Sequence, residues 1–290
     1  MTEIQDLEGK VIVVTGANSG IGFIAADNFA ARGATVALVC RDQARGQQAL
    51  RQILKSSPHA NIHLYLADFS LLASVANLTT RLLEDFPRID VLCNNAGGAN
   101  ASRQVTVEGF ERTLVTNHLS GFLLTQNLLP ALLKAAASGN ARVVFTSSLG
   151  HKNSALDFND LNLQKGYSTL KAYGRSKLMN LLTARELQRQ FAGQNLVCSS
   201  FHPGAVRTPI WSKGGILARV LGMIMYPFMV NGKRGADTLI WLATSNEAGS
   251  TSANGNYFYE RRQVSIAPFA TDAAAAQLWS TSEELVKSYR

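Results

Sequence analysis

The amino-acid sequence predicts an α/β fold: a doubly wound parallel sheet of about seven strands with helices on both faces. Short apolar runs rich in β-branched residues alternate with stretches of helical length, which is typical of a parallel sheet. Hydrophobic residues make up 46% of the chain and charged residues 17%, as in a well-packed globular protein. No internal repeat or linker-like stretch divides the sequence, so residues 1–290 are expected to form a single domain.

Each strand is expected where an apolar run is continuous, because a strand buried on both faces lacks polar alternation. KVIVVT at residues 10–15 is the first strand, and helical periodicity follows from Gly20 to the closing Gly33. ATVALVC at residues 34–40 is the second strand, followed by a helix through Lys55. Further strands are expected at 61–66, 89–93, 142–146 and 196–201, with a short last strand at 256–259.

The first strand runs into a glycine-rich turn, TGANSGIG, at residues 15–22. Glycines at such a turn let the backbone approach a pyrophosphate, and the following helix N-terminus offers free N–H groups. The spacing G-x-x-x-G-x-G differs from the usual G-x-G-x-x-G, and the alternative is a plain tight turn. Its place after the first strand favours a Rossmann-type NAD(P)-binding domain. The residues expected to contact the cofactor here are Gly16, Asn18, Ser19, Gly20, Ile21 and Gly22.

The end of the second strand bears on the choice of cofactor. An acidic residue at this position binds the ribose 2′-hydroxyl of NAD, whereas an arginine accommodates the 2′-phosphate of NADP. Cys40 cannot do the acidic job, and Arg41 follows it. NADP(H) is therefore predicted in preference to NAD(H); the alternative is that Asp42 caps the next helix and Arg41 is merely solvated.

Two later strand ends add candidate cofactor contacts. Asp68 follows the third strand, where its carboxylate suits either the adenine amino group or the cap of a helix starting at Ser70, and Phe69 lies beside it. The fourth strand ends in CNNAGG at residues 93–98, whose carboxamides are expected to shape the loop. The residues expected to lie against the cofactor in this loop are Asn95, Ala96 and Gly97.

The stretch GYSTLKAYGRSKLMN at residues 166–180 places a tyrosine four residues before a lysine twice. Residues four apart lie on one face of a helix, so Tyr167 with Lys171 and Tyr173 with Lys177 both put a cation near a phenol. A phenol beside an ammonium is a proton donor and acceptor. The spacing alone does not show which of the two pairs forms an active site, and an ordinary surface helix is a further alternative.

Taken together, these motifs resemble the short-chain dehydrogenase/reductase family. The matching stretches are TGANSGIG at 15–22, NNAG at 94–97, Asn117, the serine pair at 147–148, YGRSK at 173–177 and HPG at 202–204. The resemblance covers about residues 8 to 260. NHLSGFLLT at 117–125, SKLMN at 176–180 and HPGAVRT at 202–208 look like the retinol dehydrogenase-like and WW-domain oxidoreductase-like branch, without a WW domain.

The resemblance implies a catalytic tetrad of Asn117, Ser148, Tyr173 and Lys177. Tyr173 would exchange the proton with the substrate oxygen, and Lys177 would favour the phenolate by its charge. Ser148 would donate to the substrate oxygen, while Asn117 would hold a water that relays protons to Lys177. The resemblance also places Pro203, Gly204, Val206 and Thr208 against the nicotinamide, with Tyr173 and Lys177 as cofactor contacts.

The function expected from these residues is NADPH-dependent reduction of an apolar aldehyde or ketone, reversible to alcohol oxidation. Residues 209–230 are expected to form an apolar substrate lid, or a helix lying on a membrane surface. A redox-silent NADP-binding scaffold is the alternative, and a sugar-nucleotide epimerase is a third hypothesis.

Charge and cysteine usage bear on the partners, metal sites and disulfides that the protein is expected to have. The net charge of +8 comes from scattered lysines and arginines, so no nucleic acid partner is expected. Three cysteines in apolar runs and the absence of C-x-x-C and H-E-x-x-H predict neither a disulfide frame nor a metal site. With no apolar signal segment at the N-terminus, a cytoplasmic protein is expected, with peripheral membrane contact as an option. The resemblance suggests a homodimer or homotetramer formed through the long helices.

Overall fold

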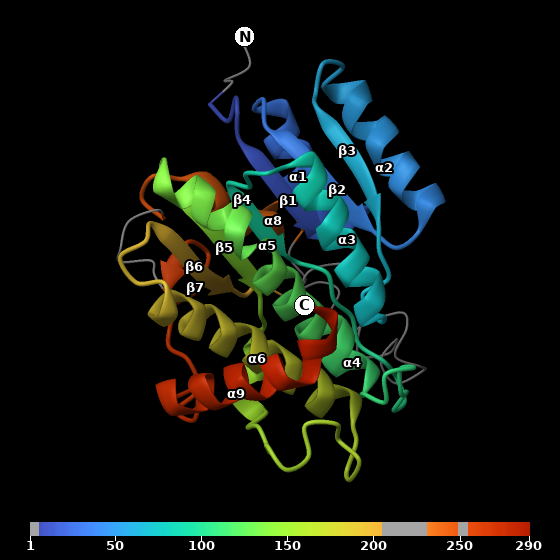
Figure 1. Cartoon of the computed structure of the whole chain (residues 1–290), viewed down its shortest axis with the longest axis vertical. Coiled ribbons are helices and arrows are strands. Elements are labelled where there is room, and N and C mark those ends of the chain that lie inside the picture. The colour runs from blue at the N-terminus through green and yellow to red at the C-terminus, as the bar shows by residue number, and fades with distance from the viewer. Residues whose placement is uncertain (1–5, 205–230, 249–254) are drawn as a thin grey trace.

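The computed structural model describes residues 6–204, 231–248 and 255–290, and it confirms the α/β fold (Figure 1). In these residues eight strands form one sheet in the order β3-β2-β1-β4-β5-β6-β7-β8. All neighbouring pairs are parallel except β7 and β8, which are antiparallel. The strand order reverses between β1 and β4, and a crevice at such a switch point is where ligands bind in open α/β sheets.

The strands follow the predicted apolar runs to within two residues at either end. One strand was not predicted, β8, which consists of two exposed polar residues and so has no apolar signal. The strands are β1 (Val11–Thr15), β2 (Thr35–Cys40), β3 (Ile62–Leu66), β4 (Val91–Asn94), β5 (Ala141–Thr146), β6 (Leu196–Phe201), β7 (Tyr257–Tyr259) and β8 (Arg262–Gln263).

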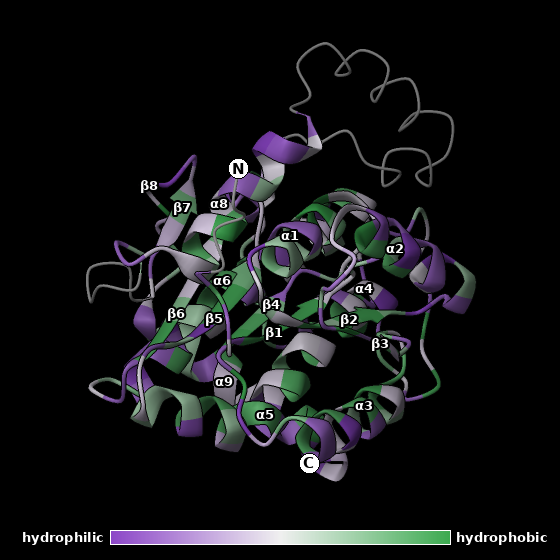
Figure 2. Cartoon of the chain, turned by 90° about the horizontal axis from the view of Figure 1, so that it is seen from above, coloured by the Kyte–Doolittle hydropathy of each residue, from purple (hydrophilic) through white to green (hydrophobic). Residues whose placement is uncertain are grey.

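Helices cover both faces of the sheet, as Figure 2 shows from above. The sheet separates the core into two clusters, one on each face. One face carries α1 (Gly20–Ala31), α2 (Gln43–Ser56) and α8 (Gly232–Thr244). The other carries α3 (Leu72–Asp85), α5 (Ser120–Ala137), α6 (Thr169–Gln190) and α9 (Asp272–Val286). Shorter segments are α4 (Arg112–Leu114), the π-helical η1 (Val115–Leu119), and the 3-10 helices η2 (Leu149–Asn153) and η6 (Lys287–Tyr289).

Helix α9 lies along α6, and the two run side by side in Figure 1. Hydrogen bonds also tie the C-terminal region to α5: Gln126 donates to Glu283, and Asn127 donates to the carbonyl of Tyr289. Part of the surface of the long helices is thus covered from within the chain. A homodimer or homotetramer through these helices stays a prediction.

Candidate active site

The turn after β1 requires glycine for steric reasons. Gly16 and Gly20 adopt φ values of +67° and +59°, a region in which an L side chain is strained. A Cβ atom at Gly22 would lie 2.6 Å from the Gly16 carbonyl oxygen and 2.6 Å from Asn95 Nδ2. A Cβ atom at Gly16 would lie 3.0 Å from the Ala96 Cα. The turn therefore packs directly against the end of β4.

The N-terminus of α1 at this turn suits an anion. Ser19 precedes the helix without capping it through its side chain, and the first turn holds no acidic residue. The amides of that first turn lack intrahelical partners, as they do in any helix, and carry partial positive charge. This arrangement fits the pyrophosphate of a dinucleotide, which binds through such amides.

Thr15 joins the ends of β1 and β4. Its Oγ1 donates to the Cys93 carbonyl at 3.2 Å and accepts from the amides of Asn95 and Ala96, each at 2.9 Å. Asn95 in turn donates from Nδ2 to the Thr15 carbonyl at 3.0 Å, and its Oδ1 accepts from Thr146 at 3.3 Å. The Asn95 side chain thus holds together the ends of three strands, β1, β4 and β5.

Of the residues that follow β2 and β3, Asp42 and Asp68 accept hydrogen bonds within the protein, whereas Arg41 is exposed. Asp42 caps α2 by accepting from the Arg45 amide at 2.9 Å, while the neighbouring Arg41 is exposed. Asp68 uses one carboxylate oxygen, Oδ1, to accept from both the amide and the hydroxyl of Ser70. Helix α3 begins at Leu72, so Asp68 caps the preceding turn rather than a helix starting at Ser70.

Lys177 is buried, with 3% of its surface exposed, on the sheet-facing side of α6. Its Nζ donates to the Thr146 carbonyl at 3.0 Å and lies 5.5 Å from the centroid of the Tyr173 ring. Burial of the ammonium lowers its pKa to about 8. The predicted Tyr173–Lys177 pair is therefore assembled on one face of the helix.

Tyr173 and Ser148 form a direct contact between α6 and the end of β5. Removal of the phenol from water raises the pKa of Tyr173, and a hydrogen bond with Ser148 opposes this rise. The pKa of Tyr173 is raised overall because desolvation outweighs the other effects. The positive charge of Lys177 alone would lower it. Ser148 Oγ accepts from the Gly150 amide at 3.2 Å, which leaves its own O–H to donate.

Asn117 lies in η1 and connects three parts of the site. Its Oδ1 accepts from the Gly98 amide at 2.8 Å, and its Nδ2 donates to the Gly98 carbonyl at 2.8 Å and to Ser176 Oγ at 2.9 Å. A Cβ atom built on Gly97 would lie 3.2 Å from Asn117 Oδ1 and 3.3 Å from Lys177 Nζ. Both side chains therefore meet at the Gly97 backbone, where a bulkier residue would have little room.

The alternative pair, Tyr167 with Lys171, has a different environment. The Tyr167 hydroxyl donates to the Asn100 carbonyl at 2.9 Å, and Tyr167 precedes the start of α6 at Thr169.

The remaining predicted cofactor contacts follow β6. The Gly204 amide donates to His202 Nδ1 at 3.3 Å, next to Pro203. Val206, Thr208 and the predicted lid at 209–230 lie outside the described residues.

Comparison with known proteins places the chain in a family. A model of the short chain dehydrogenase family matches residues 10–215. The chain belongs to that family. It is 36% identical to human Retinol dehydrogenase 14, over 97% of this chain and 87% of the relative. It is 38% identical to DnrU of a Streptomyces species, named as a daunorubicin C-13 ketoreductase, over 97% and 93% of the two chains. A solved complex of Pseudomonas aeruginosa RhlG with NADP has a TM-score of 0.69 and 26% identity, covering 89% of this chain and 97% of that one.

Sequence reasoning missed several residues that build the site of this short-chain dehydrogenase. Thr146 contributes a backbone carbonyl, which accepts from Lys177 and also from Asn180, and a backbone acceptor leaves no mark on residue identity. Gly174 matters because a Cβ atom there would lie 2.1 Å from Ser154 Oγ and 2.7 Å from the Gly150 carbonyl oxygen. The only available signal was a glycine directly after the tyrosine in YGRSK.

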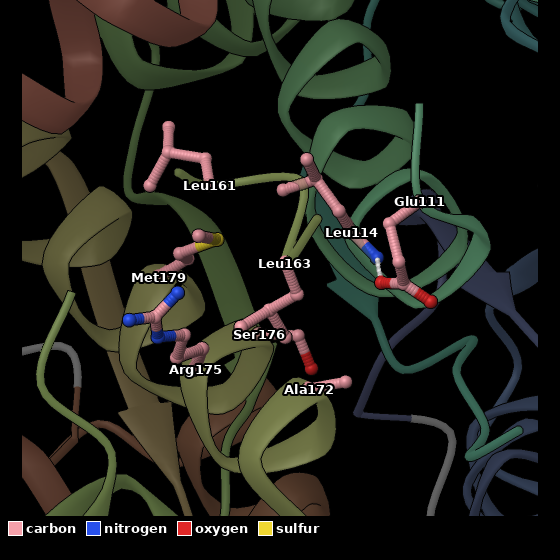
Figure 3. Close-up of a pocket in the computed structure, with 8 residues that line it drawn as sticks. All are labelled: Glu111, Leu114, Leu161, Leu163, Ala172, Arg175, Ser176 and Met179. Atoms are coloured by element: carbon pink, nitrogen blue, oxygen red, sulfur yellow. Dashed lines mark hydrogen bonds between the residues drawn. The ribbon is translucent and has the colours of Figure 1, made fainter. Parts of the chain in front are cut away.

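A small pocket of the short-chain dehydrogenase lies on another face of α6 (Figure 3). Ala172, Arg175, Ser176 and Met179 line it from the helix, whereas Tyr173 and Lys177 occupy different positions on the helical turn. The other lining residues are Glu111, Leu114, Leu161 and Leu163. This pocket is therefore separate from the face that carries the tyrosine and the lysine.

Two further features of the short-chain dehydrogenase concern metals and membranes. Among residues 6–204, 231–248 and 255–290, no group of three or more His, Cys, Asp or Glu side chains is placed to hold a metal ion. Within the same ranges no helix combines the length and apolar character needed to cross a membrane.

Proposed function

We propose that the protein is an NADP(H)-dependent oxidoreductase that reduces the carbonyl group of an apolar aldehyde or ketone, reversibly with oxidation of the alcohol. The observation that carries this proposal is the contact between Tyr173 and Ser148, with Lys177 buried 5.5 Å from the tyrosine ring. In carbonyl reduction, negative charge grows on the substrate oxygen and a proton must reach it. A phenol and a hydroxyl side by side supply a proton donor and a hydrogen-bond donor for that oxygen.

Tyr173 acts as the general acid in reduction and as the base in alcohol oxidation. Its raised pKa keeps the phenol protonated near neutral pH, which suits the reductive direction. Ser148, whose oxygen already accepts from the Gly150 amide, donates its hydroxyl proton toward the reacting oxygen. Lys177 holds positive charge beside the phenol and so stabilises the phenolate that forms as the proton leaves.

The cofactor is held by the glycine turn, the end of β4 and α6. A bound nicotinamide dinucleotide supplies or accepts the hydride. Arg41 is exposed directly after β2, where its guanidinium pairs with a 2′-phosphate, and this supports NADP(H) over NAD(H). The complex of the related RhlG with NADP adds support. Asp68, Phe69 and the residues Asn18, Ser19 and Ile21 complete the proposed cofactor contacts.

An apolar substrate is supported by two exposed leucines that lie in the sequence between Ser148 and Tyr173, each within three residues of one of them. Leu149 follows Ser148 and is 50% exposed, and Leu170 lies one residue into α6 and is 75% exposed. Contact with an apolar ligand would remove the surface of these leucines from water, which favours the binding of such a ligand. The name of the relative DnrU, a ketoreductase, is consistent with a carbonyl substrate.

The decisive experiment follows NADPH absorbance with a panel of apolar aldehydes and ketones, and repeats it with NADH. We expect turnover with NADPH, and a loss of kcat by about 100- to 10,000-fold in Tyr173→Phe. Tyr167→Phe is the matched control, since it removes a phenol of the second pair, and it should retain turnover. Full activity of Tyr173→Phe would exclude the mechanism. Tight NADPH binding without turnover of any carbonyl compound would instead favour a redox-silent NADP-binding regulator.

A further inference from the structure

His151 lies beside Ser148 in a position that the proposed chemistry does not use. It belongs to η2, the 3-10 helix that begins directly after Ser148, and its side chain has no exposed surface. Its Nδ1 lies 2.7 Å from the Ser148 carbonyl oxygen, and the Ala267 amide donates to its Nε2 at 3.3 Å. The ring therefore bridges the turn that carries Ser148 and the segment between β8 and α9.

These two bonds fix the protonation of the ring. A backbone amide can only donate, so Nε2 must accept, and the neutral ring then carries its single proton on Nδ1. That proton is donated to the Ser148 carbonyl. Burial lowers the pKa of His151, which keeps the ring neutral and preserves both bonds.

The surroundings of His151 limit its movement. The ring of Tyr257 meets it edge-on, with centroids 4.8 Å apart. The Ser148 carbonyl also accepts from the backbone amide of His151 at 3.1 Å, so the imidazole provides a second, independent bond to the same oxygen. Ser148 is thus held from its backbone side, while its Oγ remains directed by the Gly150 amide and by Tyr173.

We propose that His151 is a positioning residue for Ser148: its neutral ring ties the Ser148 carbonyl to the Ala267 amide and so sets the direction in which the serine hydroxyl donates. This inference rests on the proposed role of Ser148 at the substrate oxygen. In this role His151 contacts neither substrate nor cofactor. Its removal should therefore lower the rate of the chemical step and leave cofactor affinity unchanged.

The kinetic test uses three variants that separate the two ring nitrogens. In His151→Asn the amide nitrogen occupies nearly the place of Nδ1 and can still donate to Ser148. His151→Gln places its amide near Nε2, and His151→Phe keeps only the ring. We expect His151→Asn to stay within about threefold of wild-type kcat, whereas the other two lose about tenfold or more, with the Kd for NADPH unchanged in all three. His59→Asn, at an exposed position, is the matched control.

Two outcomes would overturn the inference: wild-type kcat in His151→Gln and His151→Phe, or equal losses of kcat and NADPH affinity in all three variants. A second measurement does not depend on the variants folding. The ¹⁵N chemical shifts of the histidines in the intact protein report the tautomer, and we expect a neutral His151 protonated on Nδ1. Protonation on Nε2 would contradict the inference even if carbonyl reduction is observed. Conversely, the Nδ1 tautomer in a protein that reduces no carbonyl compound would refute the proposed function and leave the hydrogen-bonded link intact.

Discussion

Lys177 donates a hydrogen bond from its ammonium group to the carbonyl oxygen of Thr146, 3.0 Å away and inside the protein. This bond anchors α6 to the last residue of β5, at the end of the strand where the predicted catalytic groups meet. A buried ammonium with few acceptors is costly to keep charged, which is why its pKa falls to about 8. The site therefore contains a cation whose charge is destabilising in the folded chain.

The first prediction concerns how the free energy of unfolding depends on pH. The pKa of Lys177 is about 8 in the folded protein and 10.5 in the unfolded chain. Between these values the unfolded state binds more protons, so the Lys177 contribution to the free energy of unfolding increases with pH. Urea unfolding of wild type and Lys177→Met from pH 7 to 10.5 should give a difference that shifts in favour of wild type above about pH 8. A difference that is constant with pH would show that the pKa of Lys177 is not shifted in the folded protein.

The second prediction concerns Arg41 and the cofactor. Its guanidinium is exposed and follows β2, so it should pair with the 2′-phosphate of NADPH. Arg41→Ala should raise the KM for NADPH by about 10- to 100-fold, the effect of losing a hydrogen bond to a charged group, and leave the KM for NADH unchanged. Arg51→Ala, an exposed arginine further along α2, is the control for a general loss of positive charge. An equal effect on both cofactors would contradict the role of Arg41.

The third prediction concerns Gly174. An alanine methyl group there would lie 2.1 Å from Ser154 Oγ and 2.7 Å from the Gly150 carbonyl oxygen, so α6 and η2 would have to move apart. Gly174→Ala should lower the free energy of unfolding by about 1–3 kcal/mol and reduce kcat, because η2 follows directly after Ser148. Gly139→Ala is the matched control, since a Cβ atom at that exposed glycine would meet nothing within 4 Å. Unchanged stability and kcat in Gly174→Ala would show that Ser154 and Gly150 move aside without a loss of stability or activity.

The fourth prediction concerns the hydroxyl of Tyr257. This side chain is 1% exposed, and its oxygen has no hydrogen-bond partner in the described part of the chain. A buried polar atom without a partner costs free energy, so Tyr257→Phe should raise the free energy of unfolding by about 1 kcal/mol while keeping the ring contact with His151. Chemical denaturation of the two proteins is the measurement. A loss of stability instead would reveal a partner, such as an ordered water, for this hydroxyl.

The sequence was informative where residue type alone decides structure. Continuous apolar runs located seven strands to within two residues, and the glycine turn before α1 was recognisable because its backbone excludes side chains. β8 escaped because two exposed polar residues carry no pattern. The bonds of Lys177 to Thr146 and of His151 to Ala267 escaped because they involve backbone atoms from distant segments. The steric need for Gly174 depends on Ser154, twenty positions earlier and packed against it only in the folded chain.

The C-terminal helix is also connected to the segment that carries Asn117. The next residue, His118, is buried, and its Nε2 lies 2.9 Å from the hydroxyl of Ser282 in α9. Burial lowers the pKa of His118 to about 3, so this imidazole stays neutral and needs an uncharged partner. An engineer who exchanges the C-terminal helix with that of a relative, to alter the oligomer or the solubility, would therefore also alter the support beneath Asn117. A functional chimera requires that His118 and its partner at position 282 be transferred as a pair.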